Sequence, residues 1–571
     1  MTGRSAARPY ASAKSHTAPR APRLLGNLTY LVGAVDLLTG LLHGWQVRLH
    51  LLTELLPGAL SDAAAAATVV SGVFLIVLGH SLKRRKVRAW RAAVVLVAIS
   101  VVLHVVKTEP ASATLSILGL ALLVRYRSSF DALGDPTTRW RAVRAFAGLL
   151  AFSVLAGSLT VWLARGEIVG GWPSVPDLAD QLVLGFVGAG GPLQFTAERS
   201  ADIVGSILLG LGLMTLLTPV YLALRPPEPR PELTPEDEER LRALMERHPD
   251  SLAYFNLRRD KSVVWSPTGK AAIAYRVVSG VMLASGDPIG DPEAWPGAIR
   301  AFLETADAHA WTPAVLGCSE KAGTVWVRET GFAALELGDE AVVDATAFTL
   351  EGRHMRNVRQ MVSRIERAGY VVEVSRVGEV DEGVRKRALV DAAAWRSSDT
   401  ERGFSTALGR LLDKGDADCV FVAARQDGVV RAFLQFVPWG QDGMSLDVMR
   451  RDSEAEAGVN ELLIVAALRA APSLGIKRVS LNFAAFRSAL ERSERLGAGP
   501  IVRAWGRVLL FASRWLQIES LYRFNAKFQP QWHTRFLVYP TAADLPRVSL
   551  AGLEAEAFLT WPRLGRLGGA R

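Results

Sequence analysis

The sequence GMSLDVMRRDSEAEAGVNELL, residues 443–463, combines an alternating segment, a charged segment and an apolar segment in immediate succession. Its alternation predicts a β-strand that carries these apolar side chains on one face: Met444, Leu446 and Val448. Asp447 is then expected on the opposite face, and Arg450 and Arg451 stand at the carboxyl end of the strand. A carboxylate and a guanidinium at a strand end can serve chemistry or form a surface ion pair, and this stretch alone leaves both interpretations open. The acidic loop and apolar segment that follow predict a strand–loop–helix unit.

Composition divides the chain into a membrane part and a water-soluble part. The chain has 571 residues, too many for one hydrophobic core, and its positive mean hydropathy is high for a soluble enzyme. Its two cysteines, Cys318 and Cys419, fit neither a disulfide framework nor a cysteine-rich metal site. We therefore expect a reducing, cytosolic location for the soluble part and no metal. The net charge of +10 indicates an anionic partner, either a lipid surface or a nucleic acid.

The N-terminal part predicts an all-α transmembrane bundle. Residues 1–22 predict a disordered basic tail, and residues 23–225 predict about six transmembrane helices. The apolar segments that we interpret as spans lie at about 24–42, 64–82, 90–106, 111–125, 143–164 and 199–224. Basic loops follow the second and fourth spans, so the positive-inside rule places the downstream region in the cytosol. Asp36 and His104 lie within spans, which indicates either a headgroup or transport site or a structural pair.

The region after the membrane part predicts two consecutive α/β units. A proline-rich linker at 226–235 precedes strands and helices that alternate over 236–350, and a second alternation runs over 371–545. Each unit contains a mostly antiparallel β-meander, which indicates a duplicated α/β fold. Within and beyond these units we expect a strand at 252–257, a helix at about 501–516 and a C-terminal tail at 546–571.

A basic amphipathic helix is expected between the two units, at 351–370. Its apolar residues fall on one arc of a helical wheel, and its arginines fall on the other: Arg353, Arg356, Arg359, Arg364 and Arg367. Glu366 is the acidic exception. Such a face can be merely solvated, but its scarcity of acidic residues favours an anion-binding surface, and both interpretations remain.

Several motifs, each weak alone, occur in a specific order. They are Gly286-Asp287-Pro288; Asn357-Val358-Arg359 and Ala368-Gly369-Tyr370; Trp395 with Glu401-Arg402-Gly403-Phe404-Ser405 and Gly409-Arg410; Leu446-Asp447-Val448-Met449-Arg450-Arg451; and Tyr522-Arg523-Phe524-Asn525-Ala526-Lys527-Phe528 with Pro530 and Trp532. In this order the chain, over roughly Leu233 to Pro540, resembles the phosphatidylglycerol lysyltransferases, also called multiple peptide resistance factors or aminoacyl-phosphatidylglycerol synthases.

The resemblance implies tandem acetyltransferase-like (GNAT) domains, separated by the basic helix, in a multi-pass protein of the inner cell membrane. It implies transfer of an aminoacyl group, lysyl before alanyl, from aminoacyl-tRNA to phosphatidylglycerol, which would lower the negative surface charge and weaken attraction of antimicrobial cationic peptides. No cofactor is expected beyond aminoacyl-tRNA as co-substrate. Position by position, Asp447, Arg450 and Lys527 match residues on which activity in the family depends. The candidate substrate-binding residues are Arg353, Arg356, Arg359, Arg364, Phe404, Ser405, Arg410, Arg451, Asn460 and Asn482.

The residues support the same reaction class by a partly separate argument. Acetyl-CoA-dependent members of this fold bind pyrophosphate on bare N–H groups of a Gly-rich loop at a helix N-terminus. The loop here, Asp452–Gly458, carries three carboxylates that would repel a pyrophosphate, so CoA is disfavoured. An aminoacyl ester needs only proximity, a means of deprotonating the alcohol and stabilisation of negative charge. Asp447 would orient or deprotonate the hydroxyl, or hold the α-ammonium group, while Arg450 and Lys527 would bind phosphate or the tRNA 3′ end.

Two alternative functions remain. One is a peptidoglycan-bridge type of aminoacyltransferase that acts on a lipid-linked cell-wall precursor, and the other is a non-catalytic lipid-binding or transport protein, which the intact Asp447, Arg450 and Lys527 disfavour. We interpret Phe404 as core or pocket wall rather than as a catalytic group. A nucleophilic Ser405 lacks a suitably spaced histidine. The oligomeric state is not indicated.

Overall fold

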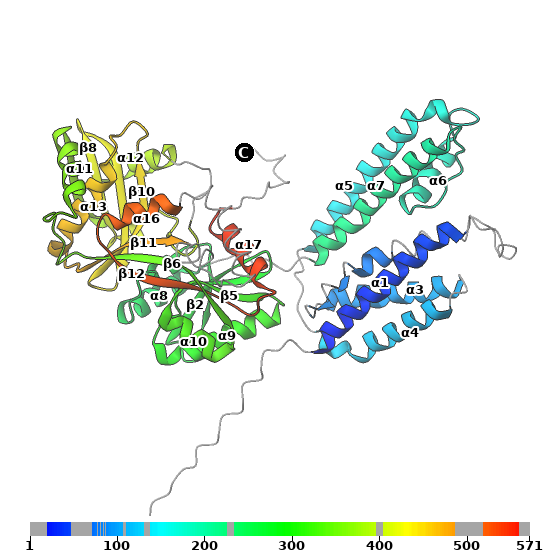
Figure 1. Ribbon diagram of the computed structural model, residues 1–571, viewed down its shortest axis with the longest axis horizontal. Helices are drawn as coiled ribbons and strands as arrows, with labels where there is room; N and C mark the ends of the chain where they lie inside the picture. Colours follow the sequence, from blue (N-terminus) through cyan, green and yellow to red (C-terminus); the bar gives the residue numbers. More distant parts are fainter. Residues whose placement is uncertain are drawn as a thin grey trace, which may run out of the picture. The chain divides into compact units, whose positions relative to one another are not determined.

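The computed structural model describes residues 20–46, 71–76, 78–79, 82–83, 85, 87–106, 110–130, 138–224, 233–395, 403–485 and 518–558. They divide into a helical unit within residues 1–227 and an α/β unit that holds most of residues 228–571 (Figure 1). The boundary falls inside the proline-rich segment 226–235.

The helical unit contains α1 (Arg20–Gln46), α3 (Val87–Val106), α4 (Pro110–Arg125), α5 (Thr138–Leu163), α6 (Val175–Phe186) and α7 (Glu198–Leu224). Two segments are long and apolar enough to cross a membrane: Arg144–Leu163 in α5 and Glu198–Val220 in α7. Shorter apolar helical segments lie at Leu24–Asp36, Ala89–Val102 and Pro110–Arg125. The described residues therefore indicate membrane association through two helices, and the expected count of six spans stays a prediction.

The two ionisable residues predicted inside spans pair with each other. The ring Nε2 of His104 lies 2.9 Å from Asp36 Oδ1, and the hydroxyl of Ser100 donates to Asp36 Oδ2 at 2.7 Å. The hydroxyls of Ser71 and Ser100 are 2.9 Å apart, and all four residues are buried. This network joins α1 to α3 and satisfies the polar groups that burial would otherwise leave unpaired.

The α/β unit is built on a single sheet of twelve strands. Its order is β1-β2-β3-β5-β12-β6-β11-β10-β9-β8-β7, with β4 paired to β2. The first-half strands are β1 (Ser262–Trp265), β2 (Ala271–Val278), β3 (Val281–Ser285), β4 (Ile289–Gly290), β5 (Thr312–Ser319) and β6 (Ala333–Asp344). The second-half strands are β7 (Tyr370–Arg376), β8 (Val420–Gln426), β9 (Val429–Trp439), β10 (Gly443–Arg451), β11 (Arg478–Ala485) and β12 (Gln531–Tyr539).

Both halves have the same plan, and they exchange their last strands. Each half contains an antiparallel meander followed by a parallel pair, β3 with β5 and β10 with β11. A helix lies between the strands of each parallel pair, α9 (Trp295–Ala308) in the first half and α13 (Val459–Ala470) in the second. β6, the last strand of the first half, pairs with β11, whereas β12 from the end of the second half pairs with β5. A division at Glu351 therefore does not separate two sheets.

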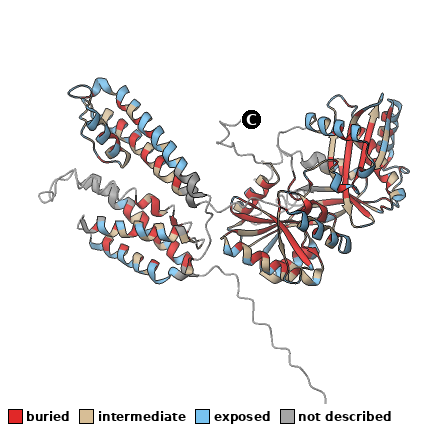
Figure 2. Cartoon of the chain, turned by 180° about the vertical axis from the view of Figure 1, so that it is seen from behind, coloured by how far each residue is buried: buried red, intermediate tan, exposed pale blue. Residues whose placement is uncertain are grey.

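Helices cover both faces of the second half, because alternate strand residues point to opposite sides. On one face, α11 (Arg356–Arg367) and α13 pack on residues such as Val422 and Leu434. On the other face, α8 (Pro235–Arg247) and α12 (Glu382–Ala394) pack on residues such as Phe421 and Phe433. The central strands β8, β9 and β10 are accordingly largely buried, while the outward sides of the helices are exposed (Figure 2).

Three expectations differ from the structure or fall outside it. The predicted strand at 252–257 is a buried 3₁₀ helix at Ala253–Leu257, because a continuous apolar run does not distinguish a buried strand from a buried helix. The expected tail from 546 begins with α17 (Leu545–Ala555), whose apolar side packs on the first half of the sheet. The helix expected at 501–516 lies outside the described residues. The remaining helices are α10 (Glu320–Thr330) and α16 (Ile518–Ala526).

Candidate active site

Asp447 occupies a β-bulge in β10. The register with β9 shifts between Leu446, opposite Phe436, and Val448, opposite Gln435, so Asp447 is the extra residue. Met444 and Leu446 pack on the α11 and α13 face, whereas Val448 packs on the α12 face. The prediction that all three share one face was wrong, because the bulge interrupts the period of two on which it rested.

The bulge directs the Asp447 carboxylate toward the segment Gly403–Leu412, which we call the strap. Oδ1 accepts a hydrogen bond from the backbone N–H of Leu408 at 2.8 Å, and Oδ2 accepts one from the side-chain amide of Gln435 at 2.8 Å. Gln435 is buried, and it also donates to Arg410 O and accepts from Leu412 N–H. Asp447 and Gln435 therefore fix the position of the strap above β9 and β10.

The parallel strands β10 and β11 separate next to this bulge. They pair only from Gly443 with Arg478 to Ser445 with Ser480, although both strands continue beyond this point. Asn482 lies in β11 just after the separation and has a positive φ of 67°, which Asn tolerates better than most residues. Its side-chain amide donates to Thr406 O in the strap and to Leu446 O in β10, at 2.8 and 2.9 Å. The predicted binding residue Asn482 thus bridges the opening and the strap.

The beginning of the strap is held by Glu556, a residue that sequence reasoning missed. Phe404 N–H donates to Glu556 Oε2 at 2.6 Å, and the N–H and hydroxyl of Ser405 donate to Oε1 at 3.0 and 2.6 Å. Phe404 and Ser405 are both fully buried. The Ser405 hydroxyl therefore anchors the strap instead of facing solvent, and Phe404 is core. No pattern near Glu556 signals this role, because it depends on a contact between distant segments.

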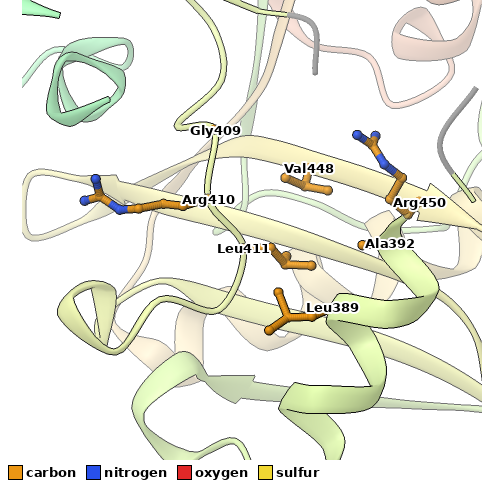
Figure 3. Close-up of a pocket in the computed structure, with 7 residues that line it drawn as sticks. All are labelled: Leu389, Ala392, Gly409, Arg410, Leu411, Val448 and Arg450. Carbon is orange, nitrogen blue, oxygen red and sulfur yellow. The ribbon is translucent and has the colours of Figure 1, made fainter. Parts of the chain in front are cut away.

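A cavity of about 290 Å³ lies between α12, the strap and β10. Its lining residues are Leu389, Ala392, Gly409, Arg410, Leu411, Val448 and Arg450. Figure 3 shows that Arg410 extends away from the other lining side chains and that the guanidinium of Arg450 lies at the opposite end of the group. The cavity therefore combines aliphatic side chains with a cation at one end, and its size is close to the lower limit for small-molecule sites.

Arg410, predicted to bind substrate, is engaged in a structural ion cluster. Its guanidinium donates to Leu257 O and Glu238 Oε1 at 2.8 and 2.9 Å, and it forms an ion pair with Asp416. Although burial acts to raise the pKa of Asp416, hydrogen bonds from Arg410 and Arg242 hold it below its usual value. Arg410 therefore ties the strap to α8 and does not face the cavity with its charge.

Lys527 follows α16 and reaches the first turn of α13. Its Nζ lies 2.7 Å from Glu461 Oε1, with Lys527 40 % exposed and Glu461 8 % exposed. Asn460 precedes Glu461, and its Oδ1 is buried without a hydrogen-bond partner among the described residues. Arg451 is exposed at the end of β10. Lys527 and Asn460 thus belong to the α13 end of the region, whereas Arg450 belongs to the cavity.

The predicted basic helix is α11, shorter than expected at both ends. Its buried side carries Val358, Val362 and Ile365, as the helical wheel predicted. Arg359 donates to Leu350 O and Arg364 donates to Ala457 O, so these two arginines also serve the structure. The side chains of Arg353, in the turn before α11, and of Arg356 are exposed and form no hydrogen bond or ion pair within the described part of the chain.

α11 also covers the loop at which a CoA pyrophosphate would bind. The N–H of Glu456 already donates to the Tyr370 hydroxyl at 3.2 Å. Gly458 has a φ of 110°, and a Cβ there would lie 2.5 Å from the side chain of Met361 in α11. A pyrophosphate would have to displace α11 in addition to meeting the loop's carboxylates, so the packing strengthens the sequence argument against CoA.

The Gly286-Asp287-Pro288 motif lies in a buried network where the two halves meet. Asp287 accepts hydrogen bonds from the N–H and hydroxyl of Ser319, each at 2.6 Å, and Arg535 of β12 lies between Asp287 and Glu340. Burial and the neighbouring Asp250 raise the pKa of Asp287 to about 6, although Arg535 acts in the opposite direction. The motif therefore secures the junction of the sheet.

Comparisons with known proteins match this chain over both units. The family model "Phosphatidylglycerol lysyltransferase, C-terminal" matches residues 242–539. The lysylphosphatidylglycerol biosynthesis bifunctional protein LysX of Rhodococcus opacus is 38 % identical over 97 % of this chain and 51 % of its own length, and that of Nocardia farcinica is 45 % identical over 75 % and 38 %. The chain thus spans about half or less of the length of these relatives. The solved structure of L-PGS from Bacillus licheniformis has a TM-score of 0.50 at 22 % identity, covering 58 % of this chain and all of that one, and it supports a shared α/β fold.

Proposed function

We propose, from the premise that this chain belongs to the phosphatidylglycerol lysyltransferase C-terminal family, that it transfers an aminoacyl group from aminoacyl-tRNA to phosphatidylglycerol. Lysyl is the first candidate group and alanyl the second. The observation that carries the proposal is that the family match, 242–539, contains the bulge at Asp447, the cavity at Arg450 and the Lys527 pair.

The proposed reaction is an ester exchange, and its parts fit the opening beside the bulge. The glycerol hydroxyl oxygen attacks the aminoacyl carbonyl carbon, the bond from that carbon to the tRNA ribose oxygen breaks, and the hydroxyl proton ends on the ribose oxygen. Asp447 orients the hydroxyl and carries the proton, because the strap and Gln435 hold its carboxylate in place. Arg450, at the end of the cavity, binds the lipid phosphate.

Lys527 and α11 are assigned to the tRNA side. Lys527 is partly exposed, so it can exchange Glu461 for a tRNA phosphate and stabilise developing negative charge. Asn460, in the first turn of α13, offers a buried acceptor oxygen without a partner among the described residues. Arg353 and Arg356, exposed before and at the start of α11, supply cations for the phosphate backbone.

The proposal extends to the architecture. The α/β unit comprises tandem acetyltransferase-like halves, which the repeated meander and parallel pair support. The helical unit is a multi-pass bundle, of which α5 and α7 supply two spans, and it keeps the α/β unit at the cytosolic surface of the inner membrane. Such tethering removes a search step, because the acceptor is confined to the bilayer.

Lipid analysis tests the function. The chain is expressed in a host that contains phosphatidylglycerol but no aminoacylated lipid, and extracted lipids are examined by mass spectrometry, with Asp447→Asn as the matched control. We expect lysyl- or alanyl-phosphatidylglycerol only with the unaltered chain. An aminoacylated cell-wall precursor instead would identify the peptidoglycan-bridge alternative, and membrane-located protein with no product would overturn the proposal.

A further inference from the structure

Helix α12 has an exposed face that combines basic and aliphatic side chains. Lys386 and Arg387 are exposed in its first half. The exposed residues of its second half are Leu389, Val390, Ala393 and Ala394. Leu389 and Val390 are 44 % and 64 % exposed, so two adjacent large aliphatic side chains face solvent. Arg387 forms an ion pair with Asp391 at 3.2 Å, and Glu382 pairs with Lys414 at 3.5 Å, which leaves Lys386 as the cation beside them that has no ion pair within the described residues. Exposed apolar residues grouped in this way indicate a surface that another partner covers.

This face is fixed relative to the site. The buried Arg385 of α12 donates to Leu412 O, at the end of the strap, and to Val377 O, at 2.6 and 3.1 Å. Leu389 belongs both to the exposed face and to the lining of the cavity, together with Ala392 from the next turn. The apolar surface therefore continues from the outside of α12 into the cavity that ends at Arg450 (Figure 3).

We propose that the exposed face of α12 docks on an anionic phospholipid bilayer, and that the lipid headgroup enters beside Leu389 to reach Arg450. The headgroup route rests on the proposed function, since it takes the lipid as acceptor, whereas the docking contact does not. Leu389 and Val390 insert into the interface, and Lys386 lies at the level of the lipid phosphates, where its charge is complementary to the surface; Arg387 can exchange Asp391 for a lipid phosphate.

A nucleic acid fits this face less well. Its backbone is bound chiefly through cations, which the exposed side of α11 supplies without aliphatic side chains, and α11 packs on the opposite face of the sheet. The arrangement places the phosphate-binding arginines on one side of the bulge and the lipid contact on the other. Donor and acceptor can then approach Asp447 from opposite faces without competing for one surface.

A nitroxide label on Val390→Cys tests the docking without requiring activity. Cys318 and Cys419 are both buried, so the label reports position 390 in the full chain reconstituted into vesicles. Oxygen partitions into the bilayer, whereas a nickel chelate stays in water. In phosphatidylglycerol vesicles we expect the label at 390 to collide more often with oxygen, and in phosphatidylcholine vesicles to shift toward the chelate. Val371→Cys is the matched control, since Val371 is 69 % exposed on the edge strand β7. A label at 390 that is as accessible to the chelate as the control overturns the proposal.

Kinetics test the headgroup route with residues that do not line the cavity. In the variant Val390→Asp with Lys386→Glu, we expect the apparent KM for phosphatidylglycerol in a bilayer to rise about five- to tenfold while kcat stays within about twofold. A water-soluble short-chain phosphatidylglycerol should be used equally well by both proteins, and Val371→Asp should change neither value. Equal losses with both lipids, or no loss with either, overturn the route. If the unaltered chain forms no product, the proposed function is refuted. The docking contact is then tested by the nitroxide label alone.

Discussion

Helices α11 and α12 cover opposite faces of the same strands, yet they expose different chemistry. α11 packs through Val358, Val362 and Ile365 and exposes arginines and small polar residues. α12 buries Arg385 in hydrogen bonds to backbone carbonyls and exposes Leu389 and Val390. A wholly polar basic face suits a phosphate backbone, and a mixed basic and aliphatic face suits a bilayer. This difference is the basis of our proposal that tRNA and lipid approach the bulge at Asp447 from opposite faces of the sheet.

The largest effect on transfer activity should come from changing the carboxylate of Asp447, which lies between the two faces. Asp447→Asn should lower transfer by roughly 100-fold or more, because a positioned acid–base group contributes about 10²–10⁴-fold. The asparagine oxygen can still accept from Leu408 N–H, but its amide nitrogen replaces the acceptor of the Gln435 amide, so one hydrogen bond near the strap is lost. Circular dichroism and tRNA binding should stay unchanged, because the other contacts of the strap remain. Transfer is measured as labelled lysine in lipid, and near-normal turnover would refute the assignment.

Reversing charge on α11 should affect only the tRNA side. Arg353→Glu with Arg356→Glu should weaken tRNA binding about 30-fold at 0.1 M salt and reduce the slope of log K against log salt by roughly 1.5, because each lost phosphate contact contributes about 0.7–0.9. Filter binding over a salt series measures both.

The control for α11 is the α12 variant Val390→Asp with Lys386→Glu, which should bind tRNA normally. Unchanged tRNA binding in the α11 variant would show that the basic side of α11 is only a solvated surface. Weakened tRNA binding in the α12 variant would show that tRNA also contacts α12, which would contradict the separate roles of the two helices.

Loosening the strap should have a smaller effect, because it reaches the bulge indirectly. Glu556→Gln leaves one acceptor oxygen for the donors of Phe404 and Ser405, so the strap should shift and kcat should fall about tenfold with KM for tRNA unchanged. The expected stability loss is about 1–3 kcal/mol. Glu554→Gln, which alters a surface bond to Ser279, should leave kcat unchanged. A fall in stability with normal kcat would limit Glu556 to a structural role.

The smallest expected change involves neither face. The folded-state pKa of Asp287 is raised to about 6, above an unfolded value of about 3.9, so the folded state binds the proton more tightly. The contribution of Asp287 to stability, about 3 kcal/mol, is therefore lost as pH rises from about 4 to 6. Asp287→Asn should remove this part of the pH dependence in urea unfolding. Identical pH profiles for the variant and the unaltered chain would contradict the shift.

Much of the fold followed from alternation and composition, but the site depended on contacts that sequence periodicity does not encode. The strands flanking Asp447 and the apolar side of α11 were predictable, because burial imposes periods of 2 and 3.6 on them. The bulge was not predictable, because one extra residue in a strand leaves no mark on the pattern of polar and apolar residues. The bulge places Val448 on the other face of the sheet. The sequence suggested that Arg410 could bind substrate, because it does not reveal the partners of this side chain. Glu238 is distant in sequence, and Asp416 is brought to Arg410 by a turn of the chain. Glu556 lies beyond the recognisable motifs, and only folding brings it to the strap.

The exchange of β6 and β12 has a consequence for synthesis of the chain. β5 is complete early, but its partner β12 emerges from the ribosome roughly 190 residues after β6. At about 5–20 residues per second, the edge of β5 would stay unpaired for roughly 10–40 s. An unpaired edge is a template for wrong strand addition. The interlocked sheet that joins the halves thus leaves the edge of β5 open to wrong pairing during synthesis until the last strand arrives.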